Sequence, residues 1–260
     1  MLITKTYYDI PTKLDPNGRP IRIFVIAPNV PGYPNAKFPG VEIYQVTGPV
    51  ERFAGQIASN GYVVACPSIY HEFEGPDPIP YDAEGTDRGN KYKIEKELAA
   101  FDEAFRATFD RRVLASFCWF ATDIHSGSLG KGKNDDSLIR VRNGELTGKG
   151  ELVMVFGKQV GSYSQREYDG LPYFSESQDT HVPREGRDLI RRTLEDANVA
   201  TTFVEVQAQH AFIRDEASKG RWDAALTRSL FSLLLETFER TVGRDLGERV
   251  DDGRKIEHVC

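Results

Sequence analysis

Two loops in the second half of the sequence carry an acid and a base that could work together. Asp179, in "DTHVP", follows the apolar run Gly150–Gly157, and His210, in "QHAFIRD", follows the run Ala200–Ala208. If these runs are neighbouring parallel strands, both side chains lie at the carboxyl edge of one sheet. There the carboxylate would orient the imidazole while the imidazole shuttles a proton. Two other interpretations stay open: Asp179 as the cap of the following helix, and His210 as a core histidine.

The elements that must position this pair follow from the hydrophobic pattern. Short apolar runs predict buried strands, and apolar residues at helical spacing predict amphipathic helices. The predicted strands are Ile21–Asn29, Tyr62–Tyr70, Arg112–Ala121, Gly150–Gly157 and Ala200–Ala208. The predicted helices are Gly48–Gly61, Tyr92–Phe109, Gly186–Asn198 and Asp223–Val242. A polar loop is predicted over His71–Gly89. This alternation predicts an α/β fold with a mostly parallel sheet covered by helices on both faces. We expect one domain, residues 1–245, and a charged tail, residues 246–260.

Composition narrows the classes of function. The net charge is −6 and the sequence pI is near 5.5, which argues against a nucleic-acid binder. The sequence contains neither a run of eighteen apolar residues nor the apolar core of a signal peptide, so no membrane partner is expected. Cys66, Cys118 and Cys260 stand far apart and are interpreted as reduced thiols of a cytoplasmic protein.

Several longer motifs together resemble one known family. The resemblance to the dienelactone hydrolase (carboxymethylenebutenolidase-like) family extends from about Ile21 to Val242 and is carried by "FPGVEIYQVTGPVERFAGQIASNGYVVACPSIYHEFEG", "WFATDIHSGSLGKGKNDD", "DTHVP" and "QHAFIRDEASKGRWD". The resemblance implies an α/β-hydrolase fold. It also implies hydrolysis of a small lactone or carboxylic ester with no metal or organic cofactor, through a triad of cysteine or serine, aspartate and histidine. We expect a monomer or weak dimer.

The resemblance also assigns roles to single residues. Asp179 matches the acid of the triad and His210 the base. Glu42, in "GVEIY", matches a glutamate that keeps the family's thiol poised, and Arg214, in "HAFIRD", matches an arginine that binds the substrate carboxylate. A second family arginine has no match, because Glu72 stands in its place; this argues against the dicarboxylate-like substrate usual in the family.

The turn that should present the nucleophile is missing from the sequence. In this fold the nucleophile sits on a G-x-[SC]-x-G turn between a strand and a helix. Each serine and cysteine of this sequence lacks glycine at one or both of the required positions. The family pattern breaks between Glu103 and Ala104, where the end of a helix, a whole strand, the turn and the start of the next helix are absent. We therefore expect the sheet to lack a central strand.

A second departure from the family pattern is an insertion. The 19 residues Val160–Gln178 are polar and aperiodic and predict a long loop. One hypothesis covers both departures: the chain derives from a mis-spliced or wrongly predicted transcript, which sequencing of the cDNA would decide.

Other motifs give weaker alternatives. "GSLGKGKN" nearly spells a phosphate-binding loop, but Asn134 replaces the hydroxyl that should hold Mg²⁺, which favours a basic surface loop. Cys118 as a substitute nucleophile sits in an apolar strand, where thiols are usually inert. His71, Asp123 and His125 do not define a metal site. Two functions remain: a hydrolase of the dienelactone type, or an inactive homologue or mis-spliced product that binds at most a small ligand or a partner.

Overall fold

The computed structural model describes residues 2–11, 18–33, 35–44, 47–95, 107–122, 124–126, 137–146, 150–159, 179, 181–218 and 220–244. Several features named above lie outside these residues: the break between Glu103 and Ala104, the insertion Val160–Gln178, the "GSLGKGKN" loop, Asp123, Cys260 and the charged tail, residues 246–260.

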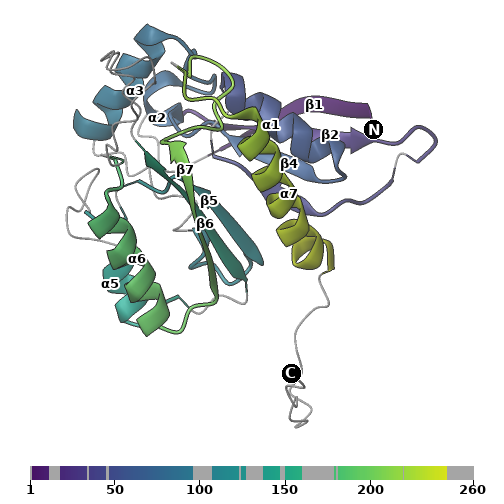
Figure 1. Cartoon of the computed structure of the whole chain (residues 1–260). Helices are drawn as coiled ribbons and strands as arrows, with labels where there is room; N and C mark the ends of the chain where they lie inside the picture. The colour runs from purple at the N-terminus through teal and green to yellow at the C-terminus, as the bar shows by residue number, and fades with distance from the viewer. Residues whose placement is uncertain are drawn as a thin grey trace, which may run out of the picture.

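The strands form two separate sheets (Figure 1). Sheet A has the order β1 (Leu2–Ile10), β2 (Ile21–Asn29), β4 (Val63–Pro67), β3 (Gly40–Glu42). Its β1–β2 and β2–β4 pairings are antiparallel, and its β3–β4 pairing is parallel. Sheet B consists of β5 (Ala115–Trp119), β6 (Glu151–Gln159) and β7 (Thr201–Gln209), all parallel. The predicted parallel arrangement therefore holds for sheet B and for only one pairing of sheet A.

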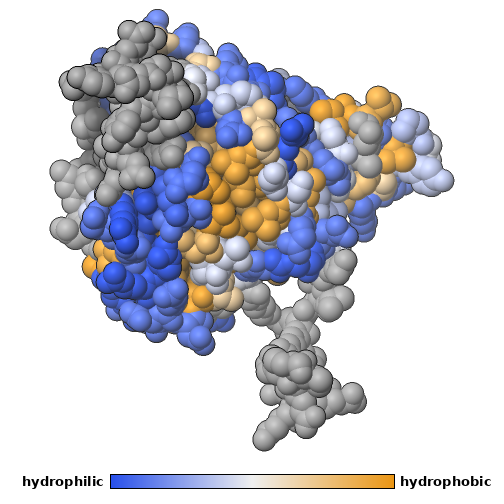
Figure 2. Space-filling model, viewed as in Figure 1, coloured by the Kyte–Doolittle hydropathy of each residue, from blue (hydrophilic) through white to orange (hydrophobic). Residues whose placement is uncertain are grey.

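Helices cover the sheets and one of them connects the two. The helices are α1 (Gly48–Ser59), α2 (His71–Glu74), α3 (Ala83–Glu95), α5 (Ser137–Arg142), α6 (Arg184–Asp196), α7 (Ala224–Arg240) and the short 3₁₀ helix η1 (Val242–Arg244). Residues of α5 and α6 pack with β5 and β6 in one core. Helix α7 crosses between the sheets (Figure 1), with Leu234 and Phe238 in the core of sheet A and Leu230 in a core of sheet B. Figure 2 shows apolar residues gathered in the middle of the face where α7 meets sheet B.

The two sheets end opposite each other without joining. Strand β3 is the last strand of sheet A and β5 the first of sheet B, and within the described residues no strand lies between them. In the described part of the chain, β5 pairs with β6 alone, and β4 with β2 and β3 alone, so the neighbours of the expected missing strand have not closed up. We call this interval the β3–β5 gap.

The sequence placed eight of these elements within a few residues, but it missed β1, β3 and α5, and one of its predictions is clearly wrong. The predicted loop His71–Gly89 is wrong, because α2 and most of α3 lie inside it. The predicted helix Tyr92–Phe109 overlaps only the end of α3, and residues 96–106 lie outside the described part of the chain. The polar composition of this stretch hid its helices, since only a few of its residues, such as His71 and Ile79, are buried.

Candidate active site

An aspartate and a histidine meet at the carboxyl edge of sheet B. His210 follows β7 directly, and Asp179 lies between β6 and α6. Because β6 and β7 are parallel neighbours, their following loops lie side by side. The Nδ1 atom of His210 lies 3.0 Å from Oδ2 of Asp179. This bond uses Nδ1 and leaves Nε2 as the ring nitrogen that can take up and return a substrate proton.

Asp179 is fully buried, with 0% exposure. Its Oδ1 accepts the backbone N–H groups of His181 at 2.8 Å and Val182 at 3.3 Å. Burial by itself would raise the pKa of this carboxyl, but the hydrogen bond and charge of His210 and the two N–H groups outweigh it, so the pKa lies below its usual value. Asp179 is not the cap of α6, whose N-cap residue is Pro183. The carboxylate is thus held ionised beside the imidazole.

A buried arginine fixes the turn that carries Asp179. Arg187, on the first turn of α6, is 3% exposed. It donates to the Val182 carbonyl at 2.7 Å and to Glu205 on β7 at 2.6 Å. Arg191 also donates to Glu205, at 2.5 Å. The Asp179–Val182 turn is therefore tied both to α6 and to the strand that leads into His210.

Two residues without a role in the sequence analysis contact His210. The ring of Phe120, at the end of β5, lies 5.1 Å from the His210 ring, and the ring of His181 lies 4.4 Å from it. Phe120 and Ala211 both have a positive φ, 54° and 61°, which is uncommon for side-chain-bearing residues and is found where a site holds its backbone in place. "DTHVP" places His181 near the pair, but no pattern in the sequence indicates its contact with His210.

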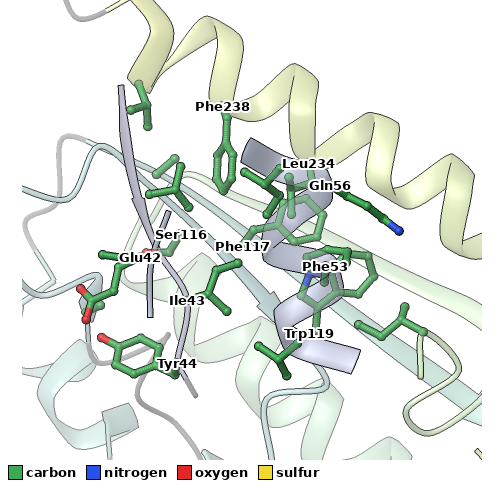
Figure 3. A pocket seen from close by; sticks show the side chains of 18 of the residues that line it. Glu42, Ile43, Tyr44, Phe53, Gln56, Ser116, Phe117, Trp119, Leu234 and Phe238 are labelled. Carbon is green, nitrogen blue, oxygen red and sulfur yellow. The ribbon is translucent and has the colours of Figure 1, made fainter. Parts of the chain in front are cut away.

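A cavity of about 770 Å³ occupies the β3–β5 gap (Figure 3). Its walls come from β3, α1, β5, α7 and the loop after β7, and they are mostly apolar. At the end nearest the acid–base pair the lining includes Glu42, Phe120, Ala211 and Arg214. The cavity therefore leads from the interval between the two sheets to the residue that follows His210.

The expected substrate-binding residues both reach this cavity. Glu42 ends β3 at the cavity mouth, where partial desolvation raises its pKa above the usual value of a glutamate. Arg214 is half-buried, and its guanidinium donates a hydrogen bond to the Tyr81 hydroxyl and lies 5.3 Å from the centre of the Tyr81 ring. Tyr81, which the sequence analysis did not single out, thus orients the arginine at the site. Glu72 lies in α2.

The two described cysteines sit in apolar cores. Cys118 is 1% exposed, in the core that sheet B forms with α5 and α6, and it does not line the cavity. Cys66 is 0% exposed, and burial, with smaller contributions from Glu51 and Glu42, raises its pKa to about 12. Both thiols therefore lack the polar setting of a reactive cysteine.

Of the other candidate residues of the sequence, the structure describes His71 and His125. Within the described residues, no group of three or more histidine, cysteine, aspartate or glutamate side chains could hold a metal ion. The His125 ring packs against Gly186, where a Cβ would come within 2.8 Å of it, so this histidine braces the start of α6. Among the residues that the structure describes, we find no helix with the length and apolarity of a membrane span.

Comparison with known proteins places the chain in a family. No family model matches it. A Saccharomyces cerevisiae protein, provisionally named carboxymethylenebutenolidase, is 47% identical over 296 aligned positions that cover all of both chains. The chain belongs to the dienelactone hydrolase family. By this membership the chain is a hydrolase, and the resemblance carried by the motifs of its sequence is confirmed.

Solved structures support the fold of this hydrolase. A dienelactone hydrolase structure from Klebsiella pneumoniae, a provisional assignment, superposes with a TM-score of 0.54 at 18% identity and covers 92% of this chain and 100% of that one. A dienelactone hydrolase-like promiscuous phosphotriesterase from metagenomic libraries gives a TM-score of 0.56 at 13% identity, covering 92% and 99%. At such identities the likeness concerns the fold, and it confirms the predicted α/β-hydrolase-like architecture.

Proposed function

We propose that Asp179 and His210 are the acid and base of a lactone or carboxylic ester hydrolase, and that this chain lacks the turn that would carry the nucleophile. The contact between His210 Nδ1 and Asp179 Oδ2 carries the first half of the proposal. The second half is supported by the sequence, in which no serine or cysteine stands between suitably spaced glycines.

The β3–β5 gap supports the absence of a whole strand. The strand that leads to the nucleophile would have to lie between the last strand of sheet A and the first of sheet B, and this interval is hollow. The alignment to the yeast relative points the same way. It spans 296 positions and this chain has 260 residues, so about 36 positions of the alignment hold no residue of this chain.

The chemistry that the pair can perform is proton transfer. In a complete site, the nucleophile gives its proton to Nε2 of His210 as it attacks the carbonyl carbon, and Asp179 stabilises the imidazolium. The C–O bond to the leaving alkoxide then breaks, the alkoxide takes that proton, and the acyl group stays on the nucleophile. A water molecule then gives a proton to His210 as it attacks the acyl carbon, the bond from that carbon to the nucleophile breaks, and the nucleophile takes the proton from His210 as the acid is released. This chain supplies the acceptor of those protons but not the attacking atom.

The substrate would enter from the carboxyl edge of sheet B, where Asp179 and His210 lie. Arg214 supplies a fixed positive charge at the cavity mouth and suits a carboxylate or another anionic group on the substrate. The carboxylate of Glu42, whose charge is opposite to that of Arg214, would help to orient the reacting group. We expect a small ester or lactone, because the lining is largely apolar with few charged groups.

An ester assay on the purified full chain tests the proposal. 4-Nitrophenyl acetate is offered to the native chain and to the His210→Ala, Asp179→Asn and Cys118→Ser variants. We expect turnover near background for the native chain, with any excess lost in the His210 and Asp179 variants and kept in Cys118→Ser. Activity that survives His210→Ala would refute the acid–base pair. Fast turnover that depends on His210 would keep the pair and refute the missing nucleophile.

A second candidate function is ligand binding without catalysis. It is favoured by the 770 Å³ cavity, whose apolar walls include Phe53, Phe117 and Trp119 (Figure 3). An apolar fluorescent dye that binds with defined stoichiometry, to a chain without esterase activity, would support this function.

A further inference from the structure

Among the described residues, both walls of the β3–β5 gap are strand edges with no further strand paired to them. On β3, Ile43 donates its backbone N–H to the Ala65 carbonyl, and the Pro39 carbonyl accepts from Val63, so alternate residues from 39 to 43 bond to β4. Successive backbone groups of a strand point to opposite sides. The N–H and C=O groups of Gly40 and Glu42 therefore point away from β4, into the gap.

The opposite wall of the gap, formed by β5, also presents backbone groups to the cavity. On β5, the Leu114 carbonyl accepts from Glu151, and Phe120 donates to the Val155 carbonyl, so the even-numbered residues bond to β6. The backbone groups of Ala115, Phe117 and Trp119 therefore face the gap. The start of β4 lies at the end of α7, where the Tyr62 ring contacts the Phe238 ring, and the start of β6 lies there too, where Arg240 pairs with Glu151. Because β3 is parallel to β4 and β5 is parallel to β6, β3 and β5 run in the same sense.

These edges decide what kind of molecule fits the cavity. A purely apolar small molecule would satisfy the side chains of the walls but would leave two rows of backbone donors and acceptors without partners, at a cost of about 1–3 kcal/mol for each buried group. The indole N–H of Trp119, which lines the same cavity, is also buried without a hydrogen-bond partner in the described structure. An extended peptide offers both the apolar side chains and the backbone groups.

We propose that the cavity is a seat for one extended β-strand supplied by another polypeptide. The strand runs parallel to β3 and β5, bonds to both, and joins sheets A and B into one sheet. β5 pairs over five residues, which matches the usual strand length of about five to six residues. Because apolar side chains of α1, α7 and both strands line the cavity, the strand must be apolar on both faces, as buried parallel strands are.

The direction of the seated strand gives the proposal a link to catalysis. Its carboxyl end would lie where Glu42, Phe120 and Ala211 line the cavity, beside His210. A cysteine in a Gly-Ala-Cys-Ala-Gly turn after the strand would place a thiol near that ring. Only this catalytic extension rests on the proposed function; the seat itself does not.

Binding is tested with the full chain and a synthetic peptide of five alternating valine and isoleucine residues, flanked by lysines for solubility and labelled for fluorescence anisotropy. Two control peptides carry N-methyl groups at the odd or at the even strand positions, which removes donors toward one edge or the other and keeps the apolar surface. We expect saturable binding of the parent peptide and a loss of about tenfold or more in affinity for each control. Equal binding of the controls, loss in only one of them, or no binding would overturn the seat.

A matched pair of protein variants locates the binding. Phe117→Arg puts a charge into the cavity, whereas Leu189→Arg changes an apolar residue on α6 that is 40% exposed. Binding should be lost in the first variant and kept in the second. Circular dichroism checks that both are folded; if Phe117→Arg is not, the N-methyl series on the native chain decides. Loss of binding in Leu189→Arg alone would overturn the location.

The catalytic extension uses the same peptide followed by Gly-Ala-Cys-Ala-Gly, with alanine in place of cysteine as the control. Ester hydrolysis that needs the cysteine, the strand and His210 supports both the seat and the proposed function. Binding without hydrolysis supports the seat and counts against the proposed acid–base pair. Hydrolysis that is unchanged in the His210→Ala variant reflects the free thiol and also counts against the pair.

Discussion

The carboxyl edge of sheet B, which carries Asp179 and His210 and which we call the rim, lies beside the β3–β5 gap. The two regions differ in how fully their polar groups are paired. At the rim, a fully buried carboxylate has three hydrogen-bond donors within reach, and an arginine ties its turn to α6 and β7. In the gap, two strand edges face a cavity. The hydrogen bonds that hold this region join α6, β7 and the turn before α6. The contact between Asp179 and His210 is thus assembled by one half of this fold.

The largest expected effect comes from inserting a strand into the β3–β5 gap, which would make this region as complete as the rim. On the proposed function, inserting between Glu103 and Ala104 a strand followed by a G-x-[SC]-x-G turn should restore the nucleophile. In this restored chain, His210→Ala should lower kcat by on the order of 10⁴-fold, because the nucleophile loses its proton acceptor. The measurement is ester hydrolysis. A restored chain that is folded and active, yet indifferent to His210→Ala, would break the comparison.

Packing should differ between the two regions in a measurable way. Phe156 on β6 is 0% exposed, and Phe156→Ala should lower the free energy of unfolding by roughly 3–5 kcal/mol. Phe117 on β5 already borders the cavity, so Phe117→Ala should cost only about 1–2 kcal/mol. Urea unfolding measures both. A larger loss for Phe117 than for Phe156 would mean that the gap is closed in solution.

Substitution of Arg187 should weaken the turn that carries Asp179. Arg187→Leu leaves the Val182 carbonyl without this donor and removes the ion pair of Arg187 with Glu205, and we expect a loss of roughly 3 kcal/mol in stability. Arg184→Leu, on the same helix turn but exposed, is the control and should change stability by less than about 0.5 kcal/mol. Equal effects of the two variants in urea unfolding would show that Arg187 does not hold the turn.

The smallest expected effect concerns pH. Partial burial, and then the neighbouring charge of His210, lower the pKa of His181 below the ordinary histidine value of 6.5. The unfolded chain therefore binds a proton at higher pH than the folded chain, so stability falls as the pH drops below about 6.5. The fall ends once the pH passes the lowered pKa. Urea midpoints between pH 7.5 and 5 should show a shallower slope for His181→Asn, and an unchanged slope would contradict this assignment.

Much of the rim could be predicted from the sequence, because its residues directly follow recognisable strands. Asp179 and His210 stand just past two apolar runs, and parallel pairing brings such positions together. Arg187, Phe120 and His181 were missed because their roles depend on contacts between elements far apart in the sequence. β1 was missed because eight of its nine residues are exposed, so it lacks the pattern of a half-buried strand.

The sequence predicted the β3–β5 gap only through a motif that it lacks. The missing G-x-[SC]-x-G turn indicated that a strand was lost, but the sequence does not show whether the neighbouring strands would close up. They remain apart because β3 and β5 are held by β4 and β6, and α7 packs across both sheets.

The central claim is that the acid–base pair forms although the gap is open, and the proton shared by the pair reports on it directly. Proton NMR of the native full chain should show a strongly downfield imidazole N–H resonance, from the hydrogen bond between His210 Nδ1 and Asp179. The resonance should vanish in both His210→Ala and Asp179→Asn and remain in His181→Asn. A native spectrum without it, or one in which it survives Asp179→Asn, would contradict the account.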